Sequence, residues 1–394
     1  MTSIHKFPAF SLLSSIILTL TACAGPQVER SEYVLTNPTT SDYEEEQEDN
    51  TSGLIGEDEN DMETDEDIND VETFELASEV FTFVGSGENA SVDGTKEHAS
   101  FAVPKMIRIG HDGNIVVIDS GSGEVRFITP DGDVSTLALS DDFLVDPTGL
   151  AVDNDGTIYI SDQQQHCIFK IQKMIAEVYA GTCGVSGNID GEIEDALFNQ
   201  PRGLALKDDG ALYVADSANN RIRMIGPKGN VHTVAGIGES SEDPSTGPIE
   251  EAHIYLPFSL AIHESGDIYF SGFDHCIRRI HHNEVENVAG LCRTSSNTGQ
   301  TDGPASQARF NTPTDIVFTD DGSLLIVDSF NDKIRKLSSD IGKVSTIAGT
   351  TRGFQDGHVD VAQFDTPRSI TIDDEGNIYV ADAINNRIRM IVVE

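Results

Sequence analysis

The sequence predicts an all-β fold made of six copies of one four-stranded unit, and three observations support this prediction. A pattern of Pro, an apolar alternating run, an acidic-Gly turn and two further apolar runs recurs every 43 to 56 residues, beginning at Pro104, Pro147, Pro201, Pro257, Pro313 and Pro367. The chain is rich in turn residues, with 35 Gly, and has no Trp. Only 38% of its 394 residues are hydrophobic, which favours many short strands over long helices. Four-stranded units repeated in this way are typical of a β-propeller, so we expect six blades around one axis.

The N-terminus has the features of an export signal. Lys6 precedes an apolar stretch over residues 7–20, which small residues follow up to Cys23. A charged start and a short apolar core predict a secretory signal over 1–22, too short to be a stable spanning helix. The stretch Leu-Thr-Ala-Cys resembles the bacterial lipobox. This resemblance implies that Cys23 is lipidated, and that the protein is anchored to the outer membrane or cell surface. An ordinary signal peptide with a chance Cys is the alternative.

Residues 23–79 have a composition unlike the rest of the chain. They contain 20 acidic residues and one basic residue, Arg30, with no sustained apolar periodicity. Repulsion between like charges and scarce apolar side chains leave such a segment unable to offset its ordering entropy. We therefore expect a disordered acidic tether, with weak calcium binding or docking of a basic partner as the alternative.

The strands of one unit follow in order from each Pro. In the last copy, strand a covers 367–372, the turn at Gly376 forms a tight hairpin, strand b covers 378–382 and strand c covers 387–391. Strand d is a short Val-x-Thr-Val/Ile-Ala-Gly segment, as at 231–236. The Ile-Arg alternation of strand c, as in 222–225, predicts one buried face and one solvated face.

The phase of the repeat predicts how the ring closes. The last copy ends after its strand c, whereas residues 81–85, before the first Pro, have the strand-d pattern. The N-terminal strand should therefore complete blade six and remove the open edge. The six copies, over 80–394, resemble NHL repeats. NHL domains commonly act as interaction platforms, so the resemblance implies that role here.

Four cysteines follow Cys23, in two pairs with the same spacing of 16 residues: Cys167, Cys183, Cys276 and Cys292. In each pair the first Cys begins a strand c and the second follows the Ala-Gly of strand d. Folding strand c onto strand d brings each pair to within disulfide range, and disulfides agree with export. A metal site that includes His166 and His275 is the rival interpretation, but neither pair has a Cys-x-x-Cys core.

The connections from strand d to the next strand a emerge on the same face as those from b to c. Five of them are long, and four carry Asp-Gly followed by Ala-x-Phe, which we interpret as a turn and a small wedge buried between blades. We call this face the loop-rich face. Binding commonly occurs at long loops on a rigid scaffold.

The residue after each Pro begins an innermost strand, at the mouth of the central channel. These six residues are Lys105, Thr148, Arg202, Phe258, Thr314 and Arg368. Three cations in a chain of net charge −42 predict an anion-binding site formed by Lys105, Arg202, Phe258 and Arg368. The alternative is that the cations pair with local acids such as Asp146 or Asp365.

Two further sets of acidic residues are interpreted as structural. The Asp-rich turns between strands a and b lack the distal Glu of a calcium loop. The Asp that ends strand b in five of the six units is expected to cap its own turn.

Two classes of function remain open at this stage. The first is a non-catalytic binding module for an extracytoplasmic protein, peptide or glycan, with no cofactor and as a monomer. The alternative is a metal-dependent lyase or lactonase, since propellers similar to this one include such enzymes. One position past the mouth only Asp315 is acidic, so we expect no metal site and no catalytic residue. The acidic charge and the export signal argue against nucleic acid as a partner.

Overall fold

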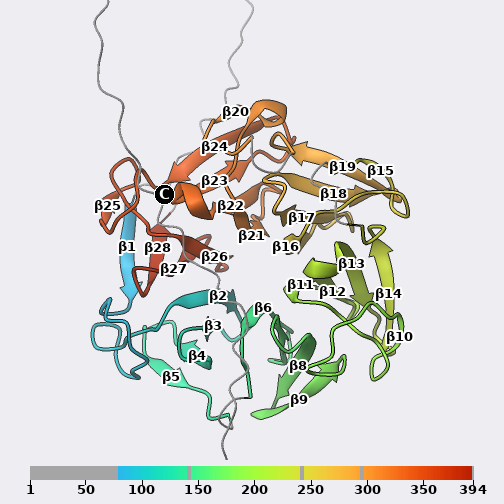
Figure 1. Cartoon of the computed structure of the whole chain (residues 1–394). Helices are drawn as coiled ribbons and strands as arrows, with labels where there is room; N and C mark the ends of the chain where they lie inside the picture. The colour runs from blue at the N-terminus through green and yellow to red at the C-terminus, as the bar shows by residue number, and fades with distance from the viewer. Residues whose placement is uncertain (1–78, 140–142, 240–243, 293–296, 393–394) are drawn as a thin grey trace, which may run out of the picture. The chain divides into compact units, whose positions relative to one another are not determined.

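The computed structural model describes residues 79–139, 143–239, 244–292 and 297–392, and these form a six-bladed β-propeller (Figure 1). Six sheets of antiparallel strands surround one axis, so the predicted fold class is confirmed. The predicted signal over 1–22, the lipidation of Cys23 and nearly all of the acidic tether lie outside the described residues. Within the described residues no helix is long and apolar enough to cross a membrane.

The strands of the first three blades run from the axis outward in chain order. Blade 1 contains β2 (Pro104–Ile109), β3 (Ile115–Asp119), β4 (Glu124–Ile128) and β5 (Val134–Thr136). Blade 2 contains β6 (Pro147–Val152), β7 (Ile158–Asp162), β8 (Cys167–Gln172) and β9 (Ile175–Ala180). Blade 3 contains β11 (Pro201–Leu206), β12 (Leu212–Asp216), β13 (Arg221–Ile225) and β14 (Asn230–Ala235).

The other three blades repeat this arrangement. Blade 4 contains β16 (Pro257–Ile262), β17 (Ile268–Gly272), β18 (Ile277–His281) and β19 (Glu284–Ala289). Blade 5 contains β21 (Pro313–Phe318), β22 (Leu324–Asp328), β23 (Lys333–Leu337) and β24 (Lys343–Ala348). Blade 6 contains β26 (Pro367–Ile372), β27 (Ile378–Asp382), β28 (Arg387–Val392) and, outermost, β1 (Glu79–Val84). Short 3-10 turns occur at η1 (Ser217–Asn219), η2 (Ala305–Gln307) and η3 (Ser329–Asn331).

The N-terminal strand closes the ring, as predicted from the phase of the repeat. β1 lies antiparallel to β28, with Val80 opposite Ile391 and Thr82 opposite Arg389. The two ends of the described chain thus share one sheet, and blade 6 has no unpaired edge on β28.

Four blades have a short fifth strand that the sequence did not predict. A segment of the preceding connection, Asp-Gly in blades 3, 5 and 6 and Thr-Gly in blade 4, pairs with the outermost strand: β10 (Gly191–Glu192) on β14, β15 (Gly247–Pro248) on β19, β20 (Gly303–Pro304) on β24 and β25 (Gly357–His358) on β1. In Figure 1 these segments lie at the periphery of the ring. We call them covering segments, because they satisfy the edge of strand d in addition to shaping a turn.

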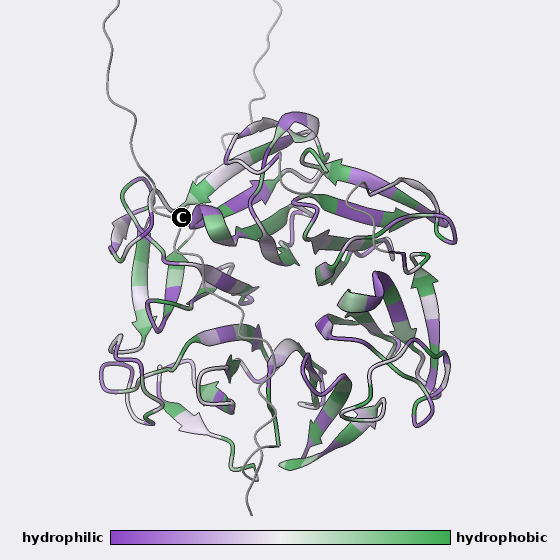
Figure 2. Cartoon of the chain, viewed as in Figure 1, coloured by the Kyte–Doolittle hydropathy of each residue, from purple (hydrophilic) through white to green (hydrophobic). Residues whose placement is uncertain are grey.

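Apolar side chains from neighbouring blades form the core. The wedge phenylalanines predicted between blades, Phe101, Phe198, Phe310 and Phe364, are fully buried. They belong to clusters that join strands of two blades, as where Phe198 packs with Tyr159 of blade 2 and Leu204 of blade 3. Figure 2 shows hydrophobic residues recurring along the strands of each blade.

The structure corrects the prediction that the arginines of strand c are solvated. Arg126, Arg223, Arg335 and Arg389 are fully buried. Each binds two aspartates, the Asp of the Asp-Gly turn in the preceding connection and the Asp that ends strand b. Arg335, for example, lies 2.5 Å from Asp302 and 2.7 Å from Asp328. Each also lies over its wedge Phe, about 5 Å from the ring centre, as Arg335 does over Phe310 at 5.3 Å. Two carboxylates and the aromatic face balance the buried guanidinium, which the period-2 pattern of the strand could not reveal.

The Asp that ends strand b is structural, as predicted, but it acts on a different segment. Asp216 accepts a hydrogen bond from the backbone N–H of Asn199 (2.8 Å), and Asp328 accepts one from Asn311 (2.7 Å). Both donors lie in the connection that precedes strand a of the same blade. Of the aspartates that end strand b in the described residues, only Asp162 also accepts hydrogen bonds from backbone N–H groups of its own turn. This Asp therefore fastens the loop-rich face to the sheet.

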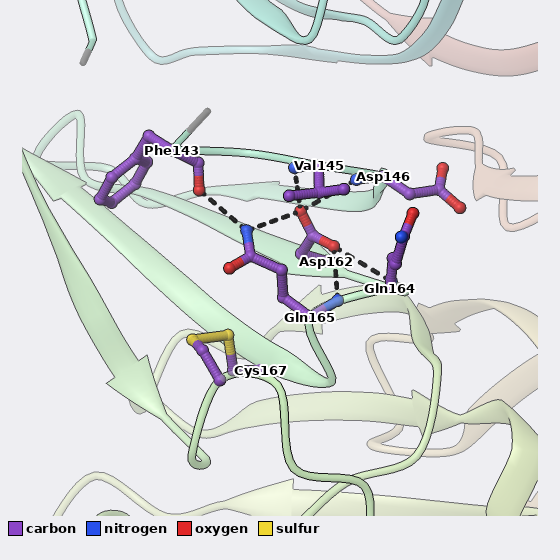
Figure 3. Close-up of a disulfide and its surroundings, with 8 residues drawn as sticks. Phe143, Val145, Asp146, Asp162, Gln164, Gln165 and Cys167 are labelled. Carbon is purple, nitrogen blue, oxygen red and sulfur yellow. Dashed lines mark hydrogen bonds between the residues drawn. A yellow bond between two sulfur atoms is a disulfide. The ribbon is translucent and has the colours of Figure 1, made fainter. Parts of the chain in front are cut away.

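Both disulfides have the pairing expected from the spacing. Cys167 is bonded to Cys183 in blade 2, and Cys276 to Cys292 in blade 4, with Cα atoms 5.1 Å and 5.2 Å apart. Figure 3 shows the bridge at Cys167 beside Asp162 and its hydrogen bonds.

The histidines next to the cysteines join neighbouring blades instead of forming a metal site. His166 Nδ1 accepts the backbone N–H of Gln200, and His275 Nδ1 that of Thr312, both at 3.0 Å. At the equivalent position of blades 3, 5 and 6, a side-chain oxygen of Asn220, Asp332 or Asn386 accepts a backbone N–H of the next blade. Because Nδ1 is an acceptor in this bond, the rival metal interpretation of His166 and His275 loses support.

Candidate binding site

The six residues at the predicted channel mouth occupy equivalent places in the structure. Each is the second residue of an innermost strand, on β2, β6, β11, β16, β21 and β26. Figure 1 shows these six strands surrounding the axis. The six side chains differ in charge and polarity, because the repeat determines the position of the strand but not the identity of the residue after Pro.

Only one of the three cations follows the alternative of local pairing. Lys105 Nζ lies 2.9 Å from Asp146 Oδ1, and both side chains are about one third exposed. Arg202 and Arg368 form no salt bridge within the described residues. Asp365, which was considered as a partner, lies 3.5 Å from Arg352.

The two arginines lie on aromatic rings. The Arg202 guanidinium is 4.6 Å from the ring centre of Phe258, and that of Arg368 is 5.6 Å from the centre of Phe330. Stacking of this kind holds a guanidinium in place while its N–H donors stay available in the ring plane. In Arg202 the Nε donor is buried and has no hydrogen-bond partner.

The threonines of the mouth act within the scaffold. Thr148 Oγ1 donates to the carbonyl of Pro201 at 3.1 Å, and Thr314 Oγ1 donates to that of Arg368 at 2.9 Å. Each hydroxyl thus ties one inner strand to the next blade. The predicted set of Lys105, Arg202, Phe258 and Arg368 is brought to one mouth, with the threonines between them as fasteners.

The charges at the mouth are not balanced. Burial lowers the pKa of Lys105, and although Asp146 opposes this effect, Arg202 and Arg368 lower the pKa further. Burial also lowers the pKa of Arg202, again with Arg368 acting in the same direction, and that of Arg368 itself. Lys105 lies close enough to Arg202 and Arg368 for both to act on its pKa, and among the described residues Asp146 is the carboxylate that pairs with it, so an additional anion would be stabilised there.

Apolar side chains on the turns between strands b and c border this mouth, and the repeat pattern did not predict them. Phe273, Phe330 and Ile384 are 38%, 45% and 51% exposed. Phe273 makes edge contacts with Phe258 at 5.9 Å and approaches Tyr255 at 6.1 Å. The sequence signal that could have identified these side chains is an apolar residue in a turn where most units have a small or polar one.

Below the mouth, an ion pair crosses between blades. Arg108 of β2 binds Asp315 of β21 through two bonds of 2.8 Å and 2.9 Å. Ser259, Ser369 and the backbone N–H of Ile370 also donate to this carboxylate. Burial alone would raise the pKa of Asp315, but Arg108 and these donors outweigh burial and lower it.

The inner strands approach too closely here for larger residues. A Cβ at Gly149 would lie 2.0 Å from the carbonyl oxygen of Arg202, and one at Gly203 would lie 2.4 Å from that of Phe258. These glycines let the backbone that carries Arg202 and Phe258 pack directly on its neighbours. The mouth is thus held by rigid strands.

Metal ligands do not gather at this site. In the described ranges no group of three or more His, Cys, Asp or Glu is arranged to hold a metal ion. Asp315, the acidic residue that the sequence places nearest, already accepts bonds from Arg108 and two serines. What the mouth offers chemically is two stacked guanidiniums, an ammonium and aromatic surface.

Comparisons with known proteins agree with this fold. A family model described as the Teneurin NHL domain matches residues 79–392. Human Teneurin-4 is 26% identical over 340 residues, which cover 73% of this chain and 12% of that protein, so the chain spans only a small part of such relatives.

Two solved structures show the same architecture. An auxiliary nutrient binding protein from Bacteroides thetaiotaomicron has a TM-score of 0.64 at 18% identity, with 82% of this chain and 78% of that chain covered. Virginiamycin B lyase from Staphylococcus aureus has a TM-score of 0.51 at 14% identity, with 80% and 99% covered. At these identities the likeness concerns the fold.

Proposed function

The chain belongs to the Teneurin NHL domain family of β-propellers, and from this premise we propose that it is a non-catalytic binding module whose ligand enters the channel mouth. A propeller is a rigid scaffold that presents side chains from several blades to one point. The nutrient-binding protein with the same fold supports a binding role for this kind of domain. The ligand class is argued from the mouth itself.

The observation that carries the proposal is the pair of stacked arginines that have no acidic partner in the part of the chain that the structure describes. Arg202 and Arg368 lie on aromatic rings and form no salt bridge within the described residues, so their positive charge is not neutralised locally. Guanidinium donors suit carboxylate oxygens, which can accept two bonds from one arginine. We therefore propose an anionic peptide or glycan as the ligand, held by carboxylates at Arg202 and Arg368 and by the apolar surface of Phe258.

We further propose that the module works outside the cytoplasm on a lipid anchor. The two disulfides support an oxidising compartment. The lipobox-like stretch that ends at Cys23 supplies the anchor, and residues 24–79 would serve as an acidic spacer. Replacing Cys23 with Ser in the producing cell should release the protein from the membrane fraction.

Calorimetric titration with hexaglutamate and with a galacturonate oligomer tests the ligand class, since the two probes share carboxylates on different backbones. Hexaglutamine and a neutral galactose oligomer are the matched controls. We expect binding of an acidic probe, and Arg202→Ala with Arg368→Ala should weaken it by about tenfold or more. Arg279→Ala, a partly exposed arginine paired with Glu286 on strand c of blade 4, should leave it unchanged. Equal affinity for acidic and neutral probes would refute the proposal.

A metal-dependent lyase or lactonase is less well supported. Such an enzyme needs several ligands over the channel, and the nearby Asp315 is committed to Arg108. If metal did bind the native mouth, it would stabilise the fold by mass action. We expect zinc and calcium at micromolar concentrations to leave the melting temperature unchanged; a clear rise would restore the enzyme interpretation.

A further inference from the structure

The outer edge of blade 2 differs from that of every other blade. In blades 3 to 6 a covering segment pairs with the outermost strand. In blade 1, Gly94 exchanges two backbone bonds with Val134, at 3.1 Å and 2.8 Å. In blade 2 the sheet order ends at β9, and no residue of the described ranges pairs with its outer side.

The groups that would receive a covering segment are missing from blade 2 as well. In blade 3, Asp190 of the covering turn accepts the backbone N–H of Thr233 (3.0 Å) and binds Arg223 (2.5 Å). Phe169 and Val178 stand opposite each other in blade 2 as Arg223 and Thr233 do in blade 3. The connection into blade 2, residues 137–146, also has no Asp-Gly. Blade 2 therefore lacks both the Asp-Gly segment and the polar residues that receive it in blade 3.

The uncovered edge presents both backbone groups and apolar side chains. β8 and β9 form a tight hairpin, with Gln172 opposite Ile175. Antiparallel pairs alternate in their bonding, so Ala176 and Val178 direct their N–H and C=O groups away from β8. Ile175 is 69% exposed and Val178 49%. Figure 2 shows hydrophobic residues along β8 and β9. An edge of this kind is a template for another strand.

We propose that β9 is a docking edge for an extended, neutral or basic segment of another protein, which adds to blade 2 as a fifth strand. The covering segments show how such a strand binds: each runs antiparallel, with Gly opposite the residue equivalent to Ala176, as Gly191 is opposite Val231. In blade 3 the residue before that Gly is Asp190, which forms a salt bridge with Arg223. In blade 2 the incoming residue at this place is apolar, because it meets Val178.

Charge decides between a foreign segment and a second copy of this chain. Each copy carries a net charge of −42, so two copies joined at identical edges repel one another. A basic segment is attracted to the same surface, and a neutral one is not repelled. Main-chain bonds then supply affinity, and the apolar contact at Val178 supplies the preference for sequence.

A designed peptide tests the edge directly. The probe is Lys-Thr-Val-Gly-Val-Thr-Lys with a fluorescent label, and its matched control has Asp in place of the Val before Gly. Binding to the full mature chain is followed by fluorescence anisotropy, and hydrogen exchange is followed at the amides of Ala176 and Val178. We expect the Val peptide to bind at least about tenfold more tightly than the Asp peptide and to slow exchange at both amides.

Variants locate the binding on the protein. Val178→Lys and, separately, Ile175→Lys should each weaken the Val peptide by about tenfold. Val361→Lys is the matched control, since Val361 is 46% exposed in the connection between blades 5 and 6. Arg202→Ala should not affect the peptide, which separates this edge from the channel mouth.

Three results would overturn the proposal. One is fast exchange at Ala176 and Val178 with the peptide in excess. The second is a concentration-dependent dimer that Val178→Lys abolishes, because that identifies a second copy as the occupant. The third is binding of the chain to phosphatidylglycerol vesicles through Ile175 and Val178, which would identify a lipid surface instead.

Discussion

Blades 2 and 3 contain the same four-stranded sheet but fasten its outer side by different chemistry. In blade 3 the first residue of strand c, Arg221, donates to the carbonyls of Gly236 and Ile237 at 3.2 Å and 3.0 Å. In blade 2 the equivalent residue is Cys167, and its disulfide to Cys183 reaches the same part of the connection. A covalent bond and a charge-assisted clamp thus do one task, which is to hold the start of a long loop against the sheet.

Blades 5 and 6 use a clamp like that of blade 3. Lys333 of blade 5 donates to the carbonyls of Gly349 and Thr350, and Arg387 of blade 6 donates to that of Ser86. Blade 4 has the disulfide and lacks the Asp that ends strand b, since Gly272 is there instead. The two blades with a disulfide are those without a complete Arg–Asp–Asp cluster. A disulfide is therefore present in the blades where the Arg–Asp–Asp cluster is incomplete.

The largest effect should come from breaking an ionic cluster. Arg335→Ala leaves Asp302 and Asp328 without their cation, and uncompensated buried charge costs about 3–5 kcal/mol of unfolding free energy. Urea denaturation of variant and parent measures the difference. Arg279→Ala, which removes a partly exposed pair with Glu286, should cost about 0–1 kcal/mol. Equal effects of the two would mean that the clusters add nothing beyond surface pairs.

Removing a disulfide should have the next largest effect. Cys167→Ser with Cys183→Ser opens a loop with a sequence separation of 16, for which the chain-entropy model gives about 3 kcal/mol. The measurement is the urea midpoint under oxidising conditions. Under reducing conditions the urea midpoints of parent and variant should become equal. If a difference between the midpoints persists, the loss of stability comes from packing of the sulfur atoms and not from the disulfide bond.

The buried Asp274 of blade 4 predicts a pH dependence, as do Asp328 and Asp382, whose pKa values burial also raises to about 6 although their clusters with arginine are complete. Burial, opposed by Arg278 at 3.7 Å, raises the pKa of Asp274 to about 6, and its Oδ1 has no hydrogen-bond partner. A raised pKa means that the folded state favours the protonated form. The stability from this group is therefore complete below the ordinary value of 3.8 and is lost as pH rises through about 6.

Asp274→Asn should remove this dependence. Relative to the parent, the variant should gain about 2 kcal/mol between pH 4 and pH 7.5. Melting temperatures of both proteins across that range give the result. Asp209→Asn, an exposed residue of blade 3, is the control. Parallel pH curves for parent and Asp274→Asn would show that Asp274 stays ionised throughout.

The smallest effect should come from moving a disulfide into a blade that uses a clamp. Thr351 of blade 5 lies three residues after Ala348, as Cys183 follows Ala180. Lys333→Cys with Thr351→Cys should form a disulfide and raise stability by about 1 kcal/mol net, since the clamp is lost. Thiol titration and urea denaturation check the two parts. Two free thiols in the folded variant would show that clamp and disulfide hold different geometry.

The sequence predicted the parts of the fold that depend on periodicity and spacing. Six units, the closing strand near Phe81 and the pairing of Cys167 with Cys183 all follow from the repeat. The burial of Arg335 could not be predicted, because it depends on Asp302, which is 33 residues away and arrives by tertiary packing. The covering segments were missed for a similar reason, since two residues such as Gly191 and Glu192 have no strand pattern of their own.

The geometry of the candidate site was predicted only in part. The position after each Pro placed Lys105, Arg202, Phe258 and Arg368 at one mouth. The pairing of Lys105 with Asp146 was foreseen as the alternative of local pairing. The stacking of Arg368 on Phe330 required the structure, because Phe330 comes from the neighbouring blade. The apolar turn residue Phe273 has no counterpart in the repeat, so its contact with Phe258 could not be foreseen.

The closing strand also determines the order of folding. Val80 pairs with Ile391, so the first strand to be synthesised must wait for the last, roughly 310 residues later. By loop-closure entropy alone this costs about 3 kcal/mol more than closing a ten-residue hairpin. Blades 1 to 5 can each assemble from local hairpins as they emerge from the ribosome, whereas blade 6 cannot. We therefore expect a nearly complete ring with β28 exposed to be the form of this protein that is most prone to aggregate.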